Sequence, residues 1–297
     1  MTYCALFEGK NGISKKKEKT VKIRFLGTGG SEGLPALFCN CPTCQNAREK
    51  KGKEIRTRMG MLIDDDLAID FPPDTYLHIL SYGLDFSAVK TLLITHSHED
   101  HFYPYDLVCR TASTSKNRTV DILEMYSNKE VQDMFYTVPW INDEIRRNLK
   151  LHEIKDGAYF ETNGYKVTAF KTPHMPNEEN ALIYLIEKGG KKYLHLCDSG
   201  EPYEEVYEYL AKNQIRLDAV AMDCTFGNLT KEFGGHMNVW QNIRVRDKLQ
   251  AIGAVTDETK VCLTHISHYG GDTYDSLNKT AQENGLILAY DGMTLEI

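Results

Sequence analysis

The chain of 297 residues lacks several features that would assign it to a class of protein. It has no run of about eighteen apolar residues, which a membrane-spanning helix needs, and its N-terminus lacks the apolar core of a signal peptide. It also lacks a basic excess, because the formal net charge is -7. That balance argues against a broad basic surface for nucleic acid. We therefore predict a cytoplasmic protein with no membrane contact, for which nucleic acid is a disfavoured partner.

The sequence also lacks a Pro-, Gly- or Ser-rich linker and any visible internal repeat. Residues 1–20, with a lysine-rich run at 15–19, are predicted to be a solvated lead-in. Residues 21–297 are predicted to form a single domain. The less regular region 102–160 allows the interpretation of a cap over a site. A homodimer is one option that the sequence leaves open.

Short apolar segments alternate with amphipathic segments, which is typical of sheets covered by helices on their outer faces and predicts an α/β or α+β fold. Strands are predicted at Val21–Leu26, Met61–Phe71, Thr91–Thr95, Tyr165–Phe170, Ala181–Ile186, Tyr193–Cys197, Ala219–Asp223, Val261–Thr264 and Leu286–Tyr290. Helices are predicted at Tyr76–Tyr82, Glu204–Asn213, Val239–Ile252 and Tyr274–Glu283. Several polar residues follow these strands directly.

The densest polar segment is Thr95–His101, which reads Thr-His-Ser-His-Glu-Asp-His after a short apolar run. His96 and His98 are two residues apart, so their side chains point the same way in an extended chain. Asp100 and His101 follow where the backbone can turn. A strand that ends in this way brings its ligands to one edge of a sheet, where two neighbouring metal ions can be held.

Three other predicted strands end in an isolated histidine or aspartate. These residues are His174, Asp198 and His265. A lone histidine at a strand end is more often a surface or hydrogen-bonded residue than a ligand. Together with Thr95–His101, and in this order along the chain, the three residues predict a larger metal site.

With these residues the chain resembles the metallo-β-lactamase superfamily, whose pattern is His-x-His-x-Asp-His, a distant His, an Asp and a final His. The resemblance covers nearly the whole chain from Val21 and implies an αββα four-layer sandwich. It implies a first metal ion bound by His96, His98 and His174, a second bound by Asp100, His101 and His265, and Asp198 as the bridge between them.

The donor atoms in this implied site suit zinc, manganese or iron, and affinity order alone does not select among them. A bridging carboxylate offsets the repulsion between two cations about 4 Å apart. The resemblance also gives Asp70 a role, which is to accept a hydrogen bond from a ligand imidazole and fix its tautomer. The chain departs from the superfamily directly afterwards, because Pro72 and Pro73 replace the usual glycine.

A second group of ligands is the Cys-x-Cys-x-x-Cys segment formed by Cys39, Cys41 and Cys44. In a reducing compartment such a cluster favours a metal site over disulfides. Three thiolates can surround a tetrahedral zinc ion, which needs a fourth ligand. His268 is otherwise unexplained and provides one. The four residues therefore predict a structural zinc that links an early loop to a late one.

The cysteine loop narrows the resemblance to the PhnP-type phosphodiesterases, which hydrolyse phosphoribosyl cyclic phosphate. Further similar segments are Gly27-Thr28-Gly29, Val220–Cys224, Leu263–His268 and Tyr290–Met293. In that family the active-site pair is often manganese. The turn 27–30 lacks the spacing and the following helix of a dinucleotide fingerprint. We interpret it as a tight turn that approaches the metal site.

The resulting hypothesis is a metal-dependent hydrolase of small, cyclic or linear phosphate diesters, with phosphoribosyl 1,2-cyclic phosphate as one substrate. Two metal ions would activate a hydroxide that attacks phosphorus. Asp100 would orient it, as the resemblance suggests. His236, between two glycines and a predicted helix, is the candidate general acid for the departing alkoxide.

Two alternatives remain at this point. One is an endonuclease like the tRNA-processing members of the superfamily, which the acidic balance disfavours. The other is a noncatalytic accessory protein similar to pyrroloquinoline-quinone protein B, which also has a cysteine-rich early loop. That interpretation predicts loss of ligands from the two-metal site, whereas every expected ligand is present here. Thioester hydrolysis and lactamase activity suit the fold, but the cysteine loop argues against both.

Overall fold

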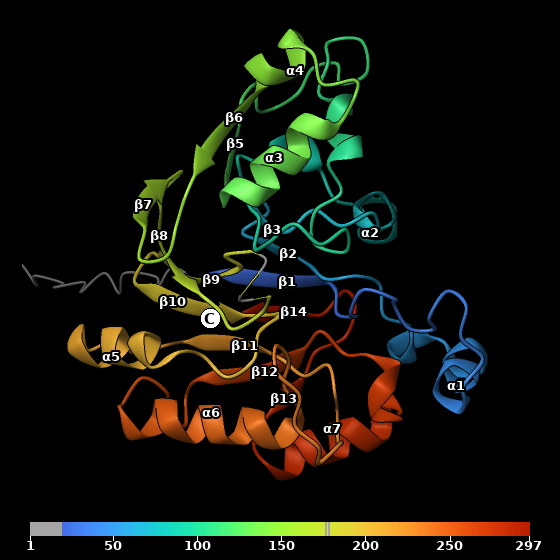
Figure 1. Ribbon diagram of the computed structural model, residues 1–297, viewed down its shortest axis with the longest axis vertical. Helices are drawn as coiled ribbons and strands as arrows, with labels where there is room; N and C mark the ends of the chain where they lie inside the picture. Colours follow the sequence, from blue (N-terminus) through green and yellow to red (C-terminus); the bar gives the residue numbers. More distant parts are fainter. Residues whose placement is uncertain (1–19, 176, 178) are drawn as a thin grey trace, which may run out of the picture.

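The structure is a computed structural model that describes residues 20–175, 177 and 179–297 (Figure 1). The predicted lead-in therefore lies outside the described residues, apart from residue 20. Within the described part of the chain, none of the helices is both long and apolar enough to cross a membrane.

The first sheet has seven strands in the order β14-β1-β2-β3-β4-β5-β6. Their bounds are β1 (Lys22–Gly27), β2 (Gly60–Ile63), β3 (Leu67–Ile69), β4 (Thr91–Leu93), β5 (Leu123–Ser127), β6 (Leu149–Glu153) and β14 (Thr294–Glu296). Strands β3 to β6 are parallel neighbours, whereas β14, β1, β2 and β3 pair in antiparallel fashion. Strand β4 is buried along its length, as expected for a parallel strand covered on both faces.

The second sheet also has seven strands, in the order β13-β12-β11-β10-β9-β8-β7. Their bounds are β7 (Tyr159–Thr162), β8 (Tyr165–Lys171), β9 (Leu182–Lys188), β10 (Lys191–Leu196), β11 (Ala219–Asp223), β12 (Lys260–Thr264) and β13 (Ile287–Leu288). Strands β10 to β13 are parallel and β7 to β10 antiparallel. Each sheet thus has a parallel half, and polar residues follow the strands of both halves.

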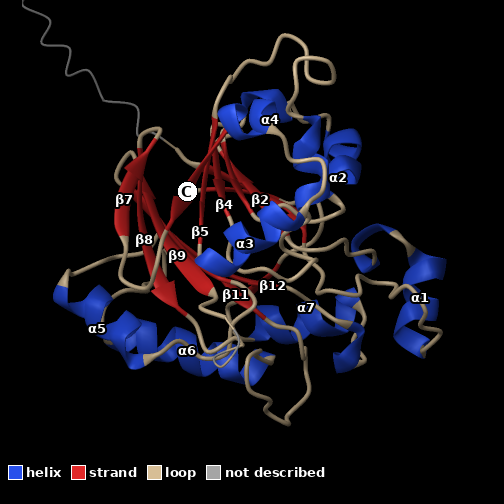
Figure 2. Cartoon of the chain, turned by 45° about the horizontal axis from the view of Figure 1, so that its top comes forward, coloured by secondary structure: helices blue, strands red, loops and turns tan. Residues whose placement is uncertain are grey.

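Helices cover the outer faces of both sheets, except α1, which lies to one side (Figure 2). Their bounds are α1 (Pro42–Lys50), α2 (Thr75–Tyr82), α3 (Lys129–Thr137), α4 (Asp143–Asn148), α5 (Glu204–Lys212), α6 (Val239–Ala251) and α7 (Tyr274–Glu283). Side chains of α3 and α4 pack on the first sheet, and those of α5, α6 and α7 pack on the second. A third cluster joins the inner faces, where Phe25 and Met61 meet Val167 and Tyr184. The predicted αββα sandwich is confirmed.

The prediction that residues 21–297 form one domain remains a proposal, and this shared inner core is the observation in its favour. The region 102–160 contains β5, β6, α3 and α4, so part of it extends the first sheet. A cap in this region stays a prediction.

The prediction of a single strand at Met61–Phe71 is wrong. The structure instead has two antiparallel strands, β2 and β3, with a tight turn between them. Asp64 and Asp65 have φ values of 47° and 61°, and aspartate tolerates this left-handed conformation better than most residues. The apolar pattern on both sides of the turn concealed it. The turn shortens β3, so that Asp70 lies just beyond the end of that strand.

Candidate metal centre

All the predicted ligands of the two-metal site lie just beyond the ends of strands, where both sheets meet one edge of the sandwich. Asp70 follows β3 and the segment 95–101 follows β4 in the first sheet, while His174, Asp198 and His265 follow β8, β10 and β12 in the second. Carboxyl ends of parallel strands share one edge of a sheet. The structure therefore brings together His96, His98, Asp100, His101, His174, Asp198 and His265.

Three of these strand ends have left-handed backbone. The φ values of Asp70, Asp198 and His265 are 63°, 49° and 57°. Such a conformation costs on the order of 1–3 kcal/mol for a residue with a side chain and is concentrated at functional sites. Here it turns the chain away from the strand and leaves the side chain at the sheet edge.

The first donor set consists of nitrogen atoms that face one another at close range. His98 Nδ1 lies 2.9 Å from His96 Nε2 and 3.3 Å from His174 Nε2. Asp198 Oδ2 lies 3.0 Å from His96 Nε2. Donors of a tetrahedral zinc ion with bonds of about 2.1 Å stand roughly 3.4 Å apart. One metal ion therefore fits these four side chains.

The second donor set depends on the tautomer of His101. The Nδ1 hydrogen of His101 is donated to Asp70 Oδ2 at 2.7 Å, so in the neutral ring Nε2 carries a lone pair. His101 Nε2 lies 3.1 Å from Asp198 Oδ2 and 3.3 Å from Asp100 Oδ2. Lone pairs repel one another unless a cation lies between them. Asp70 is thus placed as the resemblance implied.

Three buried atoms of this set have no hydrogen-bond partner among the described residues. They are His101 Nε2, His265 Nε2 and Asp198 Oδ1. A buried polar atom without a partner is rare and destabilising. His265 Nε2 lies 3.8 Å from Asp100 Oδ2 and 3.9 Å from Asp198 Oδ1, so one cation can satisfy these atoms together. The residues fit a second metal ion, with Asp198 shared by both sets.

The histidines of the two donor sets differ in the direction of their pKa shifts. Burial disfavours the charged rings, but Asp100 and Asp70 outweigh it and raise the pKa of His101 well above its usual value. In the same way Asp198 outweighs burial and raises the pKa of His265 to about 9. In the other set burial lowers the pKa of His174 to about 4. Bound metal ions would replace the protons held beside the carboxylates.

His236 also lies at this edge, immediately before the start of α6. Its ring centroid is 5.0 Å from that of His174 and 5.6 Å from that of His265. His236 Nδ1 donates a hydrogen bond of 3.0 Å to Asp223 Oδ2, and the side chain is 26% exposed. Burial opposes the charge on the ring, but Asp223 and Asp198 raise its pKa to about 11.

Asp223 is a site residue to which the sequence analysis gave no role. It ends β11, is fully buried and accepts hydrogen bonds from the backbone N–H groups of Thr225 and Met237. Its Oδ2 also lies 3.2 Å from His265 Nδ1. Asp223 could be counted among metal donors, but it faces the Nδ1 atoms of two imidazoles and is better described as their hydrogen-bond acceptor. The sequence pattern that could have identified Asp223 is the one that identified Asp198, namely an aspartate at the end of a predicted strand.

Glu179 is a second such residue, and nothing in the sequence around it indicated a role. This buried carboxylate accepts hydrogen bonds from the Ser97 backbone N–H at 2.9 Å and from Asn128 Nδ2 at 2.6 Å. Ser97 lies between His96 and His98, so Glu179 fixes the turn that presents both rings.

The turn 27–30 approaches the centre as the sequence analysis interpreted it. A Cβ atom on Gly30 would lie 3.3 Å from Cε1 of His265, and one on Gly27 would lie 2.0 Å from the Arg58 carbonyl oxygen. The backbone N–H of Gly30 also bonds to the Ile266 carbonyl. Glycine is therefore required at position 27, beside the Arg58 carbonyl, whereas a side chain at position 30 would press on the His265 ring.

The cysteine cluster also assembles, at the start of α1. Donor atoms of Cys39, Cys41, Cys44 and His268 lie within 4.8 Å of one another. His268 Nδ1 is 3.5 Å from the Sγ atoms of Cys39 and Cys41. Burial opposes ionisation of Cys41, but the backbone N–H of Cys44 and then His268 lower its pKa to about 6, whereas burial raises that of Cys44 to about 11. The donor set fits a tetrahedral zinc ion, which would hold all three as thiolates.

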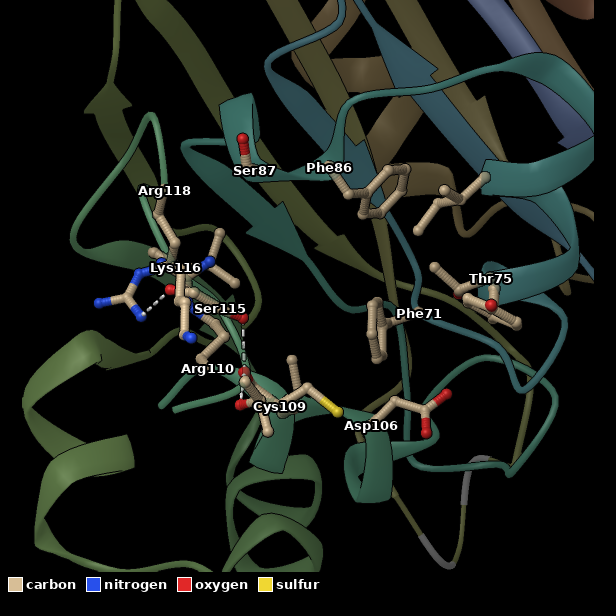
Figure 3. A pocket seen from close by; sticks show the side chains of 15 residues that line it. Phe71, Thr75, Phe86, Ser87, Asp106, Cys109, Arg110, Ser115, Lys116 and Arg118 are labelled. Atoms are coloured by element: carbon tan, nitrogen blue, oxygen red, sulfur yellow. Dashed lines mark hydrogen bonds between the residues drawn. The ribbon is translucent and has the colours of Figure 1, made fainter. Parts of the chain in front are cut away.

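A cavity of about 550 Å³ lies apart from both groups (Figure 3). Its walls include Phe71 and Phe86 together with Arg110, Lys116 and Arg118. The predicted metal ligands are not part of its lining. Arg110 and Arg118 donate hydrogen bonds to backbone carbonyls of the surrounding loop, so they stabilise that loop.

Comparison with known proteins agrees with this geometry. The family model of the beta-lactamase superfamily domain matches residues 77–266, so the chain belongs to that superfamily. Ribonuclease Z of Archaeoglobus fulgidus is 24% identical over 197 residues, which are 65% of this chain and 58% of that protein. Ribonuclease Z of Picrophilus torridus is 26% identical over 161 residues, 52% of this chain and 45% of that protein. The chain thus spans about half the length of these curated relatives.

Solved structures share the fold over most of the chain. A diphosphatase from the PhnP family superposes with a TM-score of 0.73 at 21% identity, covering 94% of this chain and 98% of that one. The zinc-bound PqqB from Methylobacterium extorquens gives a TM-score of 0.65 at 17% identity, covering 93% and 100%. The resemblance seen in the sequence is confirmed at the level of superfamily and fold.

Proposed function

We propose that this protein is a metal-dependent phosphodiesterase that hydrolyses small phosphate diesters. The observation that carries the proposal is the arrangement around Asp198, which has three imidazoles of one set on one side and Asp100, His101 and His265 on the other. His236 stands beside this carboxylate, with Nδ1 held by Asp223.

Metal binding at this centre is part of the proposal. His96, His98 and His174 would hold the first ion, Asp100, His101 and His265 the second, and Asp198 both. Such ions lower the pKa of water and neutralise the oxygens of a phosphate. We propose manganese or zinc, with iron as a further option, and a structural zinc ion at Cys39, Cys41, Cys44 and His268. The buried atoms of His101, His265 and Asp198 that have no hydrogen-bond partner among the described residues support the assignment of the two-metal site.

The chain's own residues would then manage the protons. Asp100 lies beside His101 and His265, where its carboxylate can accept a hydrogen bond from the attacking water and orient it. His236 has one ring nitrogen fixed by Asp223, which leaves Nε2 to protonate the departing ester oxygen. The pKa of about 11 would fall once metal ions neutralise Asp198, and His236 would then release its proton more readily.

The proposed substrates are small cyclic or linear diesters, with phosphoribosyl 1,2-cyclic phosphate as one candidate. The overall fold of the PhnP-family diphosphatase and the assembled cysteine cluster support this choice. A cytoplasmic location and a homodimer remain predictions.

An RNA-cleaving activity is the second candidate, because the curated relatives are ribonuclease Z proteins. The net charge of -7 argues against it, since RNA binding depends on the neutralisation of phosphates by basic residues. A noncatalytic role like that of a pyrroloquinoline-quinone accessory protein is disfavoured, because both donor sets are complete.

Metal analysis followed by a substrate screen tests the proposal. We expect about three metal ions per chain and hydrolysis of cyclic phosphates such as phosphoribosyl 1,2-cyclic phosphate. One zinc ion per chain without hydrolysis after loading with manganese or zinc would favour the accessory role. Cleavage of a precursor tRNA, with no reaction on small diesters, would favour the endonuclease.

A further inference from the structure

Three aromatic side chains form a row that begins beside His236. Phe226 lies with its ring centroid 5.9 Å from that of His236, at an interplanar angle of 88°. Phe233 and Tyr269 flank Phe226 at 4.4 Å and 6.4 Å, with ring planes inclined by 35° and 39°. We refer to Phe226, Phe233 and Tyr269 as the aromatic platform.

The platform is anchored on its inner side and open on its outer side. The backbone N–H of Phe226 bonds to the Met237 carbonyl, so the ring is fixed to the segment that also positions His236. At the other end, Tyr269 follows His268 of the cysteine cluster, and their ring centroids are 4.7 Å apart. Phe233 and Tyr269 are nevertheless 38% and 59% exposed. None of the three rings belongs to a hydrophobic core cluster of the described residues, so core packing does not account for the platform.

The position of the platform relates it to the substrate. An ester oxygen that receives a proton from His236 must lie against that ring, so the group attached to the oxygen extends along the neighbouring surface. On the Phe226 side this surface consists of aromatic rings. Stacked and edge-to-face arrangements of planar rings are favourable beyond simple burial.

We propose that the aromatic platform binds the base of a mononucleotide, so that the substrate is a small diester carrying a nucleobase. This inference rests on the proposed phosphodiesterase activity and narrows its substrate class. Bases of any kind stack on aromatic side chains, because every base has a π-face. A sugar phosphate without a base would make no stacking contact with Phe233 or Tyr269, whose neighbours within the chain include Lys231 and His268.

The test compares two substrates that differ in the base. Metal-loaded full-length protein is assayed with adenosine 2′,3′-cyclic phosphate and with glycerol 1,2-cyclic phosphate. In Tyr269→Leu and Phe233→Leu the ratio of the two kcat/KM values should fall roughly 5- to 150-fold, as expected for one stacking contact. Tyr159→Leu removes an exposed aromatic ring from strand β7 and should leave the ratio unchanged. Tyr269→Phe should preserve the ratio, because the ring remains.

A binding measurement separates this inference from the proposed activity. Titration with adenosine 5′-monophosphate and glycerol 3-phosphate should show weaker binding of the nucleotide alone in Tyr269→Leu. If neither cyclic phosphate is hydrolysed but this difference is present, the activity is refuted and the base site stands. Hydrolysis with an unchanged ratio in both leucine variants overturns the base site. Cleavage of a short oligoribonucleotide far faster than of the cyclic nucleotide overturns the assignment to a mononucleotide.

Discussion

The histidine and carboxylate centre and the cysteine cluster use the same stretch of chain in different ways. His265 extends directly from the end of β12 and is almost fully buried between carboxylates. Three residues later, His268 lies in a short 3-10 helix and is partly exposed beside the cysteine loop. The first centre is thus built on strand ends, whereas the second is built on the segment that leads into α1 and on a short 3-10 helix.

Because of this difference, we expect a bound metal ion to have a different role at each of the two groups. The strand-end residues are held by two sheets and by carboxylates such as Asp70, Asp223 and Glu179, so contacts within the protein orient these side chains. Cys44, in the first turn of α1, packs in a small separate cluster with Leu34, Ala36 and Ala47. A bound ion should therefore contribute chemistry at the first centre and mainly stability at the second.

The largest expected effect comes from the carboxylate shared by both metal positions. Asp198→Asn should reduce turnover by roughly ten-thousandfold or more, because water activation and charge neutralisation fail together. The cysteine cluster should still retain its zinc. Metal content and diester hydrolysis are measured in parallel. Retention of all metal ions with normal turnover would contradict the assignment of Asp198 as the bridge.

His236→Ala is expected to lower kcat by about a hundred- to ten-thousandfold on alkyl diesters while metal content is preserved. The loss should be much smaller for a 4-nitrophenyl ester, since that leaving group departs without a proton. Asp223→Asn should give a similar dependence on the leaving group at a smaller magnitude, because Asp223 acts through the imidazole. Equal losses on both kinds of ester would argue against general-acid catalysis.

Carboxylates that support ligands offer a matched pair of variants. Asp70→Asn should weaken metal binding at the second position by roughly 10- to 100-fold, because His101 loses its acceptor. Glu32 lies 3.6 Å from His268 Nε2 at the partly exposed cluster, so Glu32→Gln should weaken zinc binding less. Competition with a chelator measures both affinities. If Glu32→Gln weakened metal binding more than Asp70→Asn did, the expectation that the supporting carboxylate matters more at the buried centre would be wrong.

Cys44→Ser should remove one zinc ion and destabilise the fold by a few kcal/mol, lowering Tm by roughly 5–15 °C. The residual activity per active-site metal ion should change far less. Cys262→Ser is the control, because Cys262 is equally buried in the inner core but outside the cluster. Thermal unfolding with and without a chelator distinguishes them, since only the control should still respond to loss of the structural zinc. An unchanged Tm in Cys44→Ser would refute the structural role.

His78, a buried histidine outside both centres, gives the smallest effect at neutral pH. Burial lowers its pKa to about 4, so the unfolded chain binds a proton more readily than the folded one. The stability from neutral His78 is complete above pH 6.5 and is lost as the pH falls towards 4, by roughly 3 kcal/mol. His78→Gln should remove this part of the pH dependence. Parallel stability curves for both proteins between pH 6.5 and 4 would contradict it.

The prediction of the fold succeeded where hydrophobic patterns were long and failed where they were interrupted. The strands before His174, Asp198 and His265 were evident from apolar runs, and the two-sheet sandwich was implied by the resemblance to the superfamily. The turn within 61–71 was missed, because apolar residues on both sides conceal it. Strands β5, β6, β7 and β14 were missed too, since each is short and contains charged residues that interrupt the apolar pattern.

The sequence by itself determined the identity and order of the candidate metal ligands, because imidazoles, carboxylates and thiolates in this spacing match the pattern of the superfamily it resembles. Only the tertiary structure decided how these groups are oriented. The roles of Asp223 and Glu179, the tautomer of His101 and the aromatic platform all depend on contacts between residues distant along the chain. The physical reason is that ligand types are local properties of the chain, whereas hydrogen-bond partners and stacking surfaces arise only when both sheets meet at one edge.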